Sequence, residues 1–382
     1  MKLELSPEQA FFAGTTRQFL DDKVPTSLLR ELRNDPAGFD REFWRQGADL
    51  GWTSLLVTED DGGGSVSGEG VCDLALVAFE FGRYAAPGPL TTANVVTAAV
   101  ARSGTAEQKA GLLPDLMSGA RIGSWAYAEP RPFERLGTVS LQATRRDGRY
   151  VLSGHKAPVE SAVEAEVFLV TAAAEAGGLT QFVIPADTPG VSVTPMRTLD
   201  MTRRYGHVVF DEAAVPDSAV LGEPGAAGDD VERQLQIALV IQLAEMTGAM
   251  DRGMEITTEW LFNRYSFGRP LASYQALKHR FADMKSYLEA ANGLADAAAQ
   301  HVQDESARAG EYVSAGKSFL GEYALQVLHE CVQFHGGIGV TFEHDLHLYL
   351  RRAVLDAQLY GTVADHRDRL TSILESREQL HV

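Results

Sequence analysis

The hydrophobic pattern of this 382-residue chain changes its period twice, and these two changes restrict the fold more than any other feature. Residues 1 to about 120 repeat apolar side chains at helical spacing, after a helix-start signal at Ser6 and Pro7. Between about 124 and 222 the apolar residues gather in short β-rich runs with turns between them. From about residue 229 the helical spacing returns and continues to the end. The pattern therefore predicts helical, β and helical segments in that order.

The middle region predicts several short strands, one of which follows a turn at Arg146, Asp147 and Gly148. The apolar runs behind this prediction lie at residues 139–143, 150–152, 167–171, 181–184 and 207–210. A chain of this length exceeds what one hydrophobic core supports, so more than one domain is expected. We predict an α+β multidomain fold with an N-terminal helical domain over residues 1–122, a middle β-barrel or sandwich over 123–225, and a C-terminal four-helix bundle over 226–382.

The composition excludes several classes of function. The net charge is −18, whereas binding to nucleic acid or to anionic lipid requires an excess of Lys and Arg. An anionic ligand would therefore have to meet a local basic site. The two cysteines, Cys72 and Cys331, lack the CxxC spacing of zinc sites and disulfide frameworks. The first residues show no apolar signal core, and no segment approaches about 20 apolar residues, so we expect a cytoplasmic protein without membrane insertion.

The clearest local motif is R-x-x-F-G-x-x-L-x-x-x-Q, which runs from Arg264 to Gln275. An arginine beside an aromatic ring and a glycine suits a pyrophosphate, because a guanidinium group can bond two phosphate oxygens at once. Phe267 supplies the ring, and Gly268 would let the backbone approach closely. A helix break with an exposed arginine explains the same residues equally well.

A second motif, Q-x-x-G-G-x-G, begins at Gln333 and contains Gly336, Gly337 and Gly339. Glycines between two helices expose backbone N–H groups at a helix start, which favours an anion. A tight turn between helices is the alternative interpretation. The run from Glu343 to Ala353 contains His and Asp residues, but its helical leucines and the lack of further ligands favour surface ion pairing, and no metal site is predicted.

The two motifs, roughly 65 residues apart, resemble the acyl-CoA dehydrogenase family in combination with the helical, β and helical order. The resemblance covers nearly the whole chain, with weaker matches around Glu129 and Lys156. In that family these motifs reach across a subunit interface and hold FAD that is seated mainly on the neighbouring subunit. The resemblance therefore implies FAD contacts at Arg264, Phe267, Gly268, Gln275, Gln333, Gly336, Gly337 and Gly339.

The resemblance also implies a catalytic glutamate, which removes the α-proton of an acyl-CoA thioester while the flavin accepts hydride from the β-carbon. Most members place this residue directly before a Gly-Thr pair near the C-terminus, where this chain has Tyr360. Others place it on the first helix of the C-terminal domain, close to Ala238 here. Glu245 lies two turns further along that helix, about 10 Å away, so a structural role is favoured for it.

The middle region departs from the family as well. After the segment at Glu129 the family expects a Gly-Ser-Asp group, but this chain has Glu134 there, whose charge would repel a pyrophosphate. After Lys156 the family expects an aromatic residue and then Thr or Ser against the flavin ring, but this chain has Pro158 and Glu160. A carboxylate facing the ring would disfavour an anionic reduced flavin. The lost residues are those that would seat the chain's own FAD.

With these losses, the sequence resembles the non-catalytic partner chain of some actinobacterial family members. Those members act on steroid side chains as α2β2 heterotetramers that hold half the usual flavin. The resemblance implies an acyl-CoA substrate and a homologous acyl-CoA dehydrogenase subunit as partner, with an electron-transfer flavoprotein-like protein as one candidate acceptor. Two alternatives remain open. One is a self-sufficient homotetrameric acyl-CoA or acyl-ACP dehydrogenase with a relocated base, Glu245 or Tyr360. The other is a non-redox binding or scaffold protein on the same fold.

Overall fold

The elements follow the predicted helical, β and helical order in the computed structural model, which describes residues 5–130, 136–175 and 177–379. The chain groups into two compact units. The helical unit comprises Met1–Arg30, Leu74–Ala86 and Leu239–Val382, and the sheet unit comprises Glu31–Asp73 and Pro87–Ala238. The domain boundaries at 122/123 and 225/226 stay a prediction.

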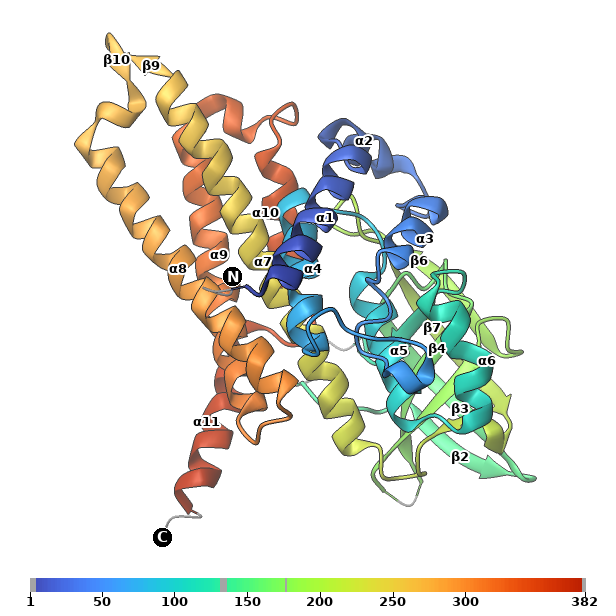
Figure 1. Ribbon diagram of the computed structural model, residues 1–382. Coiled ribbons are helices and arrows are strands. Elements are labelled where there is room, and N and C mark those ends of the chain that lie inside the picture. The colour runs from blue at the N-terminus through green and yellow to red at the C-terminus, as the bar shows by residue number, and fades with distance from the viewer. Residues whose placement is uncertain (1–4, 131–135, 176, 380–382) are drawn as a thin grey trace. The chain divides into compact units, whose positions relative to one another are not determined.

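Three long helices make up most of the helical unit. They are α7 (Gly228–Asn263), whose second part belongs to this unit, α8 (Gln275–Gln303) and α9 (Ala309–His335). Helix α9 packs against α8, which runs beside it in Figure 1, and also against α10 (Leu346–Asp356) and α11 (Val363–Gln379). The unit also contains α1 (Pro7–Lys23), most of α2 (Thr26–Glu31) and of α4 (Gly70–Tyr84), and the 3₁₀ segments η4 (Leu271–Ser273) and η5 (Gly336–Val340).

The predicted start of the first helix is confirmed. The Ser6 side chain accepts a hydrogen bond from the backbone N–H of Gln9, while the Gln9 side chain accepts one from the backbone N–H of Ser6. This reciprocal capping box satisfies two N–H groups that the helix itself cannot pair, and Pro7 occupies the first turn, where its missing N–H costs nothing. No helix among the described residues is long and apolar enough to cross a membrane.

Two glycines bring α4 and α7 into backbone contact. A Cβ atom at Gly82 would lie 2.0 Å from the carbonyl oxygen of Glu245, and one at Gly248 would lie 2.0 Å from that of Phe79. Any larger residue at either position would push the helices apart, because a Cβ atom never approaches backbone so closely. The backbone of Glu245 therefore lies in direct contact with α4.

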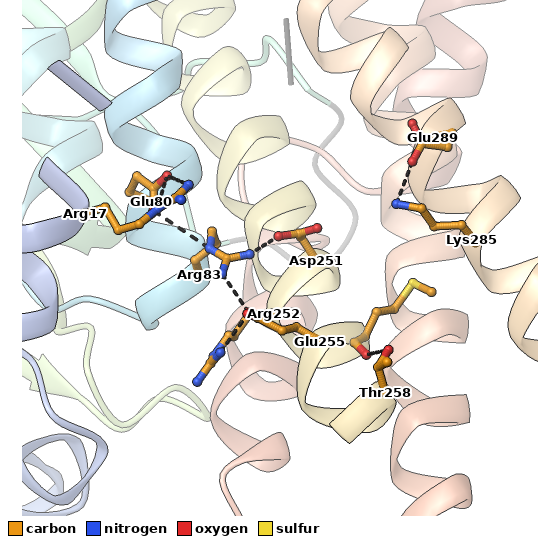
Figure 2. A network of polar contacts seen from close by, with 10 residues as sticks. Arg17, Glu80, Arg83, Asp251, Arg252, Glu255, Thr258, Lys285 and Glu289 are labelled. Atoms are coloured by element: carbon orange, nitrogen blue, oxygen red, sulfur yellow. Dashed lines mark hydrogen bonds and ion pairs between the residues drawn. The ribbon is translucent and has the colours of Figure 1, made fainter. Parts of the chain in front are cut away.

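Charged side chains join α1, α4 and α7 in the network that Figure 2 shows. Glu80, which is 1% exposed, pairs with Arg17 at 2.7 Å. Arg83 pairs with Asp251 and, at 2.7 Å, with Glu255. A buried charge is tolerated when it is paired and hydrogen-bonded, so this network fixes how the three helices pack.

The sheet unit is built on one eight-stranded sheet, which stands where the sequence predicts a barrel or sandwich. The strand order is β6-β7-β3-β2-β4-β5-β8, and β1 pairs with β4. The strands are β1 (Gly123–Ala126), β2 (Gln142–Arg146), β3 (Arg149–Glu160), β4 (Val167–Ala174), β5 (Leu179–Pro185), β6 (Val191–Met196), β7 (Tyr205–Val215) and β8 (Val220–Leu221). The core includes Phe168, Phe182 and Phe210.

Helices and short 3₁₀ segments surround this sheet. Helix α5 (Leu90–Ser103) packs on β1, and α6 (Ala106–Met117) packs on α5. The remaining elements of the unit are α3 (Arg41–Asp49), η1 (Leu32–Asn34), η2 (Glu59–Asp61) and η3 (Asp217–Ala219). All residues of α5 from 90 to 100 are buried, which is unusual for a helix at the side of a sheet and matches its nearly unbroken apolar and Thr-rich sequence.

The turn predicted after β2 is confirmed as a two-residue hairpin. Arg146 pairs with Arg149, and between them Asp147 has a φ of +49° and Gly148 a φ of +77°. Two positive φ angles are typical of a type I′ turn, for which Asp-Gly is a preferred pair. The edge strand β6 escaped the sequence prediction, and its Pro195 fits an edge because the missing N–H interrupts no central ladder.

Candidate cofactor-contact site

The motif at residues 264–275 forms a short hairpin between α7 and α8, visible at one end of these helices in Figure 1. Strand β9 (Tyr265–Ser266) pairs antiparallel with β10 (Arg269–Pro270). The two residues between them have positive φ angles, +49° at Phe267 and +79° at Gly268, again the pattern of a type I′ turn. The phenyl ring at the tip is 97% exposed.

Hydrogen bonds and a ring contact fix the base of the hairpin. The backbone N–H of Leu271 donates to the carbonyl oxygen of Arg264 at 2.8 Å, and the Tyr274 hydroxyl donates to the carbonyl oxygen of Ser266 at 2.7 Å. The Arg269 guanidinium lies over the Tyr274 ring, 3.9 Å from its centroid, a cation–π contact. The hairpin is therefore a defined structure, where the sequence suggested only a loop or a helix break.

The four glycines of the two motifs are glycine for different reasons. A Cβ atom at Gly268, Gly336 or Gly337 would meet no atom of the chain within 4 Å. Gly268 and Gly336 need their positive φ angles, +79° and +64°, which disfavour other residues. Gly339 is buried, and a Cβ there would lie 2.5 Å from the carbonyl oxygen of Val332, so packing inside the chain explains it.

The glycine-rich motif does not start an α-helix. It follows the end of α9 and forms the 3₁₀ segment η5, and the next α-helix, α10, begins only at Leu346. The predicted α-helix start at these glycines is therefore wrong, while the anion site itself stays a prediction. What the segment does offer is open backbone at Gly336 and Gly337, both exposed.

Trp260 connects the two motifs, and sequence reasoning missed it. Its indole N–H donates to the carbonyl oxygen of Phe334 at 3.1 Å, and its ring stacks on His335 with centroids 5.0 Å apart. The Arg264 guanidinium lies over the same ring, 5.6 Å from the centroid. Its place one helical turn before Arg264 is a signal that could have singled it out.

The region around the hairpin is basic in an otherwise acidic chain. Residues 264–285 contain five Lys or Arg residues and one acidic residue, whereas the whole chain has a net charge of −18. Arg280 pairs with Glu330, while Arg264 and Arg269 lie over aromatic rings and are exposed. This is the kind of local basic site that an anionic ligand would need.

The turn at Tyr360 is held by two buried side chains that sequence reasoning also missed. Tyr360 has a φ of +56°. The buried Lys317 donates from Nζ to the carbonyl oxygens of Asp356 and Leu359, the latter at 2.8 Å, and His366 donates from Nε2 to the carbonyl oxygen of Tyr360 at 2.9 Å. The turn where the family resemblance predicts a glutamate is thus held by two buried side chains and carries Tyr360.

Burial shifts the pKa values of both side chains. It lowers the pKa of Lys317 to about 7, and the neighbouring carboxylate of Asp356 opposes this change. It lowers the pKa of His366 to about 4, partly offset by the hydrogen bond to Tyr360. A neutral His366 fits its contacts, because Nε2 donates to a carbonyl and Nδ1 then accepts from the Ser314 hydroxyl at 3.3 Å.

Ala238 and Glu245 are both buried on α7. The Glu245 carboxylate lies 3.8 Å from the guanidinium of Arg352, which is fully buried and donates to the carbonyl oxygens of Ala85 and Ala86. A buried glutamate in such an ion pair serves packing between helices, so these contacts favour the structural role that the sequence suggested for Glu245.

In the sheet unit a buried ion pair joins the two weaker family matches. Lys156, fully buried, donates to Glu129 at 2.8 Å and to the carbonyl oxygen of Tyr127 at 2.9 Å. Glu129 also accepts from the N–H groups of Ser140 and Leu141. Burial alone would raise the pKa of Glu129, but Lys156 and these hydrogen bonds hold it below its usual value.

Glu160 is also buried inside the sheet unit, 3% exposed, where it pairs with Arg203 and accepts from the backbone N–H of Thr92 at 3.2 Å. This corrects the interpretation that Glu160 presents its charge to a flavin ring, because an internal arginine compensates that charge. Glu134 lies outside the described residues.

The His and Asp residues after the second motif make local contacts. Asp345 pairs with Arg30, and the Nδ1 atom of His344 accepts from the backbone N–H of Leu346 at 3.2 Å. The His344 and His335 rings lie 4.4 Å apart. Within the described ranges no group of three or more His, Cys, Asp or Glu side chains is arranged to hold a metal ion.

Comparison with known proteins identifies the three parts of the chain. Residues 6–120, 124–213 and 230–374 match the N-terminal, middle and C-terminal domains of acyl-CoA dehydrogenase. The chain is 30% identical over 366 residues to the acyl-CoA dehydrogenase IpdE2 of Mycobacterium tuberculosis, covering 96% of each chain. The family is FAD-dependent.

Solved structures agree with this match. A chain from a variant of the Tcur3481-Tcur3483 steroid ACAD superposes with a TM-score of 0.88 at 28% identity, covering 97% of this chain and 99% of that one. A chain of the ChsE4-ChsE5 complex from Mycobacterium tuberculosis does so with a TM-score of 0.88 at 26% identity, covering 98% and 99%. In sequence and in fold, over nearly its whole length, this chain belongs to the acyl-CoA dehydrogenase family.

Proposed function

We propose that this chain is a subunit of an acyl-CoA dehydrogenase that lacks the catalytic glutamate and completes the FAD site of a homologous partner subunit. The observation that carries the proposal is the solvent exposure of the residues in the two motifs. Of the eight residues that the family resemblance assigns to the FAD contact, seven are exposed here at one end of the helical unit, namely Arg264, Phe267, Gly268, Gln275, Gln333, Gly336 and Gly337, whereas Gly339 is buried. Among the described residues, no packing contact explains why Phe267, Gln275 and Gln333 stand at exposed positions.

The residues at this end fit the group that the proposal assigns to them. The exposed Arg264 would bind a phosphate oxygen, and at Gly336 and Gly337 even a Cβ atom would meet no atom of the chain within 4 Å, which leaves room for a bulky ligand. Phe267 offers an exposed aromatic face. Bound FAD would supply a hydride acceptor for the oxidation of a thioester, and the residues of this chain would orient it and shield it from water.

The sheet unit does not fit a flavin of its own. Where the family expects a Thr or Ser against the ring, Glu160 forms a buried ion pair with Arg203. Releasing that carboxylate toward a ligand would leave a buried charge uncompensated, which costs several kcal/mol. We therefore propose that the chain relies on a partner subunit to hold the flavin. Such a pair of different subunits is consistent with an α2β2 assembly.

The absence of a carboxylate at Tyr360 and Ala238 leaves Glu245 as the candidate for a self-sufficient enzyme. Glu245 is 1% exposed and 3.8 Å from Arg352 in the packing between helices, so it is poorly placed to take a proton from a substrate. The base must then come from the partner. A scaffold role without redox chemistry is also disfavoured, because it would not maintain the exposed motifs.

The substrate of the complex is an acyl-CoA, and we propose a steroid side-chain thioester. The support is similarity to a solved steroid acyl-CoA dehydrogenase and to the ChsE4-ChsE5 complex, which is a two-component assembly. A complex that oxidised only short linear thioesters would rule this substrate out. An electron-transfer flavoprotein-like protein is the proposed acceptor.

The deciding experiment measures FAD per chain by absorbance. The chain is purified alone and after co-expression with a candidate homologous acyl-CoA dehydrogenase subunit. A colourless lone chain and a complex with one FAD for two chains would support the proposal. A lone chain that binds one FAD each and oxidises acyl-CoA would refute it, and Glu245→Gln would then test that residue as the base.

A second experiment tests the sheet unit separately. Tyr360→Glu supplies a carboxylate on the rigid turn but leaves the Glu160–Arg203 pair in place. We expect the isolated variant to remain inactive and free of flavin. Dehydrogenase activity in this variant alone would show that the sheet unit can seat FAD after all.

A further inference from the structure

We infer that Trp260 is a positioning residue that fixes the spacing of the two cofactor-contact motifs. The inference rests on the proposed function, because it concerns how the chain presents Arg264 and the Gln333 motif to FAD on the partner. Trp260 itself belongs to neither motif. Its side chain contacts residues of both: Arg264, directly after α7, and two residues at the end of α9.

The contacts on the α7 side hold Arg264. Trp260 lies four residues before Arg264, which places both side chains on one face of the helix, and the backbone N–H of Arg264 donates to the carbonyl oxygen of Trp260 at 2.8 Å. The guanidinium lies 5.6 Å from the indole centroid, within the range of a cation–π contact. An exposed arginine on a flexible stem loses entropy when it binds, and a ring beneath it restricts the stem beforehand.

The contacts on the α9 side hold the second motif. The indole N–H donates to Phe334, the residue directly after Gln333, and the indole ring stacks on His335, the residue directly before Gly336. His335 is fixed in turn, because its Nδ1 donates to the carbonyl oxygen of Cys331 at 2.8 Å. One indole thus touches the peptide that carries the glutamine and the ring that precedes the glycines.

A general stabilising role would predict something different. A tryptophan that only fills space would lower the stability of the chain when removed, and its effect on FAD would be independent of Arg264. A positioning residue acts through the groups that it holds, so its removal and the removal of Arg264 should overlap in their effect on FAD binding.

The test is a double-mutant cycle on the assembled complex, with FAD as the probe. The dissociation constant of FAD is measured by titrating flavin into the flavin-depleted complex for Arg264→Ala, Trp260→Leu, and the double variant. We expect Arg264→Ala to raise the constant about tenfold or more and Trp260→Leu to raise it roughly threefold to tenfold. The double variant should exceed Arg264→Ala by less than the factor of Trp260→Leu alone.

Each outcome has a separate meaning. If the two factors multiply, or if Trp260→Leu leaves the constant unchanged while Arg264→Ala raises it, the inference about Trp260 is overturned. If Arg264→Ala itself has no effect, the proposed function fails and not merely this inference. Trp260→Phe keeps a ring under the guanidinium, so it should retain most of the affinity, and it decides the question should the leucine variant fail to assemble.

The chain offers a matched control at a different place in the helical unit. The Tyr312 ring also lies between a histidine and an arginine, with the His301 ring 3.9 Å away and the Arg308 guanidinium 4.8 Å from its centroid. Tyr312→Leu removes a comparable set of contacts near the start of α9. It should leave the dissociation constant of FAD unchanged, and an equal loss there would reduce the Trp260 effect to general destabilisation.

Discussion

Two hairpins of this chain share one turn geometry and differ in what explains it. In the sheet unit the turn residues Asp147 and Gly148 have φ angles of +49° and +77°, and in the helical unit Phe267 and Gly268 have +49° and +79°. Aspartate tolerates the left-handed region because its short polar side chain can bond to the nearby backbone. Phenylalanine has no such bond, and its ring is 97% exposed, so burial does not compensate either.

The comparison separates a turn residue that local conformation explains from one that it does not explain. Local chemistry accounts for Asp147 completely. Phe267 goes against local preference at a position where the chain gains nothing from it, which is the pattern of a residue kept for a contact outside the chain. The second hairpin is therefore the place where variants should separate function from stability.

The largest expected effect is that of acid on the helical unit. Among the described residues, the histidines whose pKa values are lowered by burial all lie in this unit: His335, His344, His347 and His366. The pKa of His366 falls from 6.5 to about 4, so between these values the unfolded chain binds a proton that the folded chain does not. The free energy of unfolding should fall as the pH drops through this window, by roughly 3 kcal/mol from His366 alone.

Urea unfolding at about pH 7.5 and about pH 5 checks this pH dependence. His366→Gln keeps a donor for the carbonyl oxygen of Tyr360 but cannot titrate, so its stability should change less between the two conditions. An equal pH dependence in the variant and the parent would show that His366 is not the responsible group.

Arg264→Ala should have the next largest effect, and only on FAD. Loss of a charge-assisted hydrogen bond corresponds to about 1.5–3 kcal/mol, or roughly ten- to hundredfold weaker retention of flavin by the complex. Arg146→Ala at the Asp147 hairpin removes an exposed arginine that pairs with Glu212 and should leave flavin content unchanged. Absorbance measures the flavin content of both variant complexes. An equal loss of flavin in Arg264→Ala and Arg146→Ala would show that the two hairpins do not differ in function.

Gly268→Ala and Gly148→Ala should cost the isolated chain about the same, roughly 1–2 kcal/mol each. A Cβ atom would meet no other atom within 4 Å at either glycine, so the cost comes from the positive φ angle alone. Thermal unfolding of the two variants measures it. A clearly larger cost at one site would mean that the two turns are not equivalent in solution.

The smallest effect, but the sharpest test, is an exchange of turn residues. Phe267→Asn should stabilise the lone chain slightly, by at most about 1 kcal/mol, because asparagine is favoured in the left-handed region. The same variant should weaken flavin retention in the complex. Asp147→Phe should destabilise the chain by a similar amount without any effect on flavin, and a Phe267→Asn complex with full flavin content would remove the functional reason for the ring.

Most of the fold could be predicted from local signals. The Ser6 cap and the turn at Asp147 and Gly148 depend on residues adjacent in sequence, and both are confirmed. Strand β6 escaped although its first four residues alternate between apolar and polar, because Pro195 is disfavoured in a strand other than at a sheet edge. The hairpin at Phe267 escaped because its strands have two residues each and Phe-Gly is not the expected turn pair.

The candidate site was only partly predictable for a related reason. The motif residues are read directly from the sequence, but their supports come from distant positions. Lys156 and Glu129 are 27 residues apart, Glu160 and Arg203 are 43 apart, and Trp260 meets Phe334 across 74. Such pairs depend on how elements pack, and no period or spacing in a single sequence reports them.

The turn around Tyr360 has an evolutionary consequence. Lys317 and His366 hold the turn through its backbone, so under the proposed function a carboxylate could be introduced at position 360 by changing one codon, without rebuilding the turn. The sheet unit is different, because the Glu160–Arg203 pair must be exchanged as a pair: removing one charge of a buried pair is strongly destabilising. Under the proposed function, the ion pair in the sheet unit would make dependence on a partner hard to reverse, whereas the turn at Tyr360 would not hinder the gain of a carboxylate.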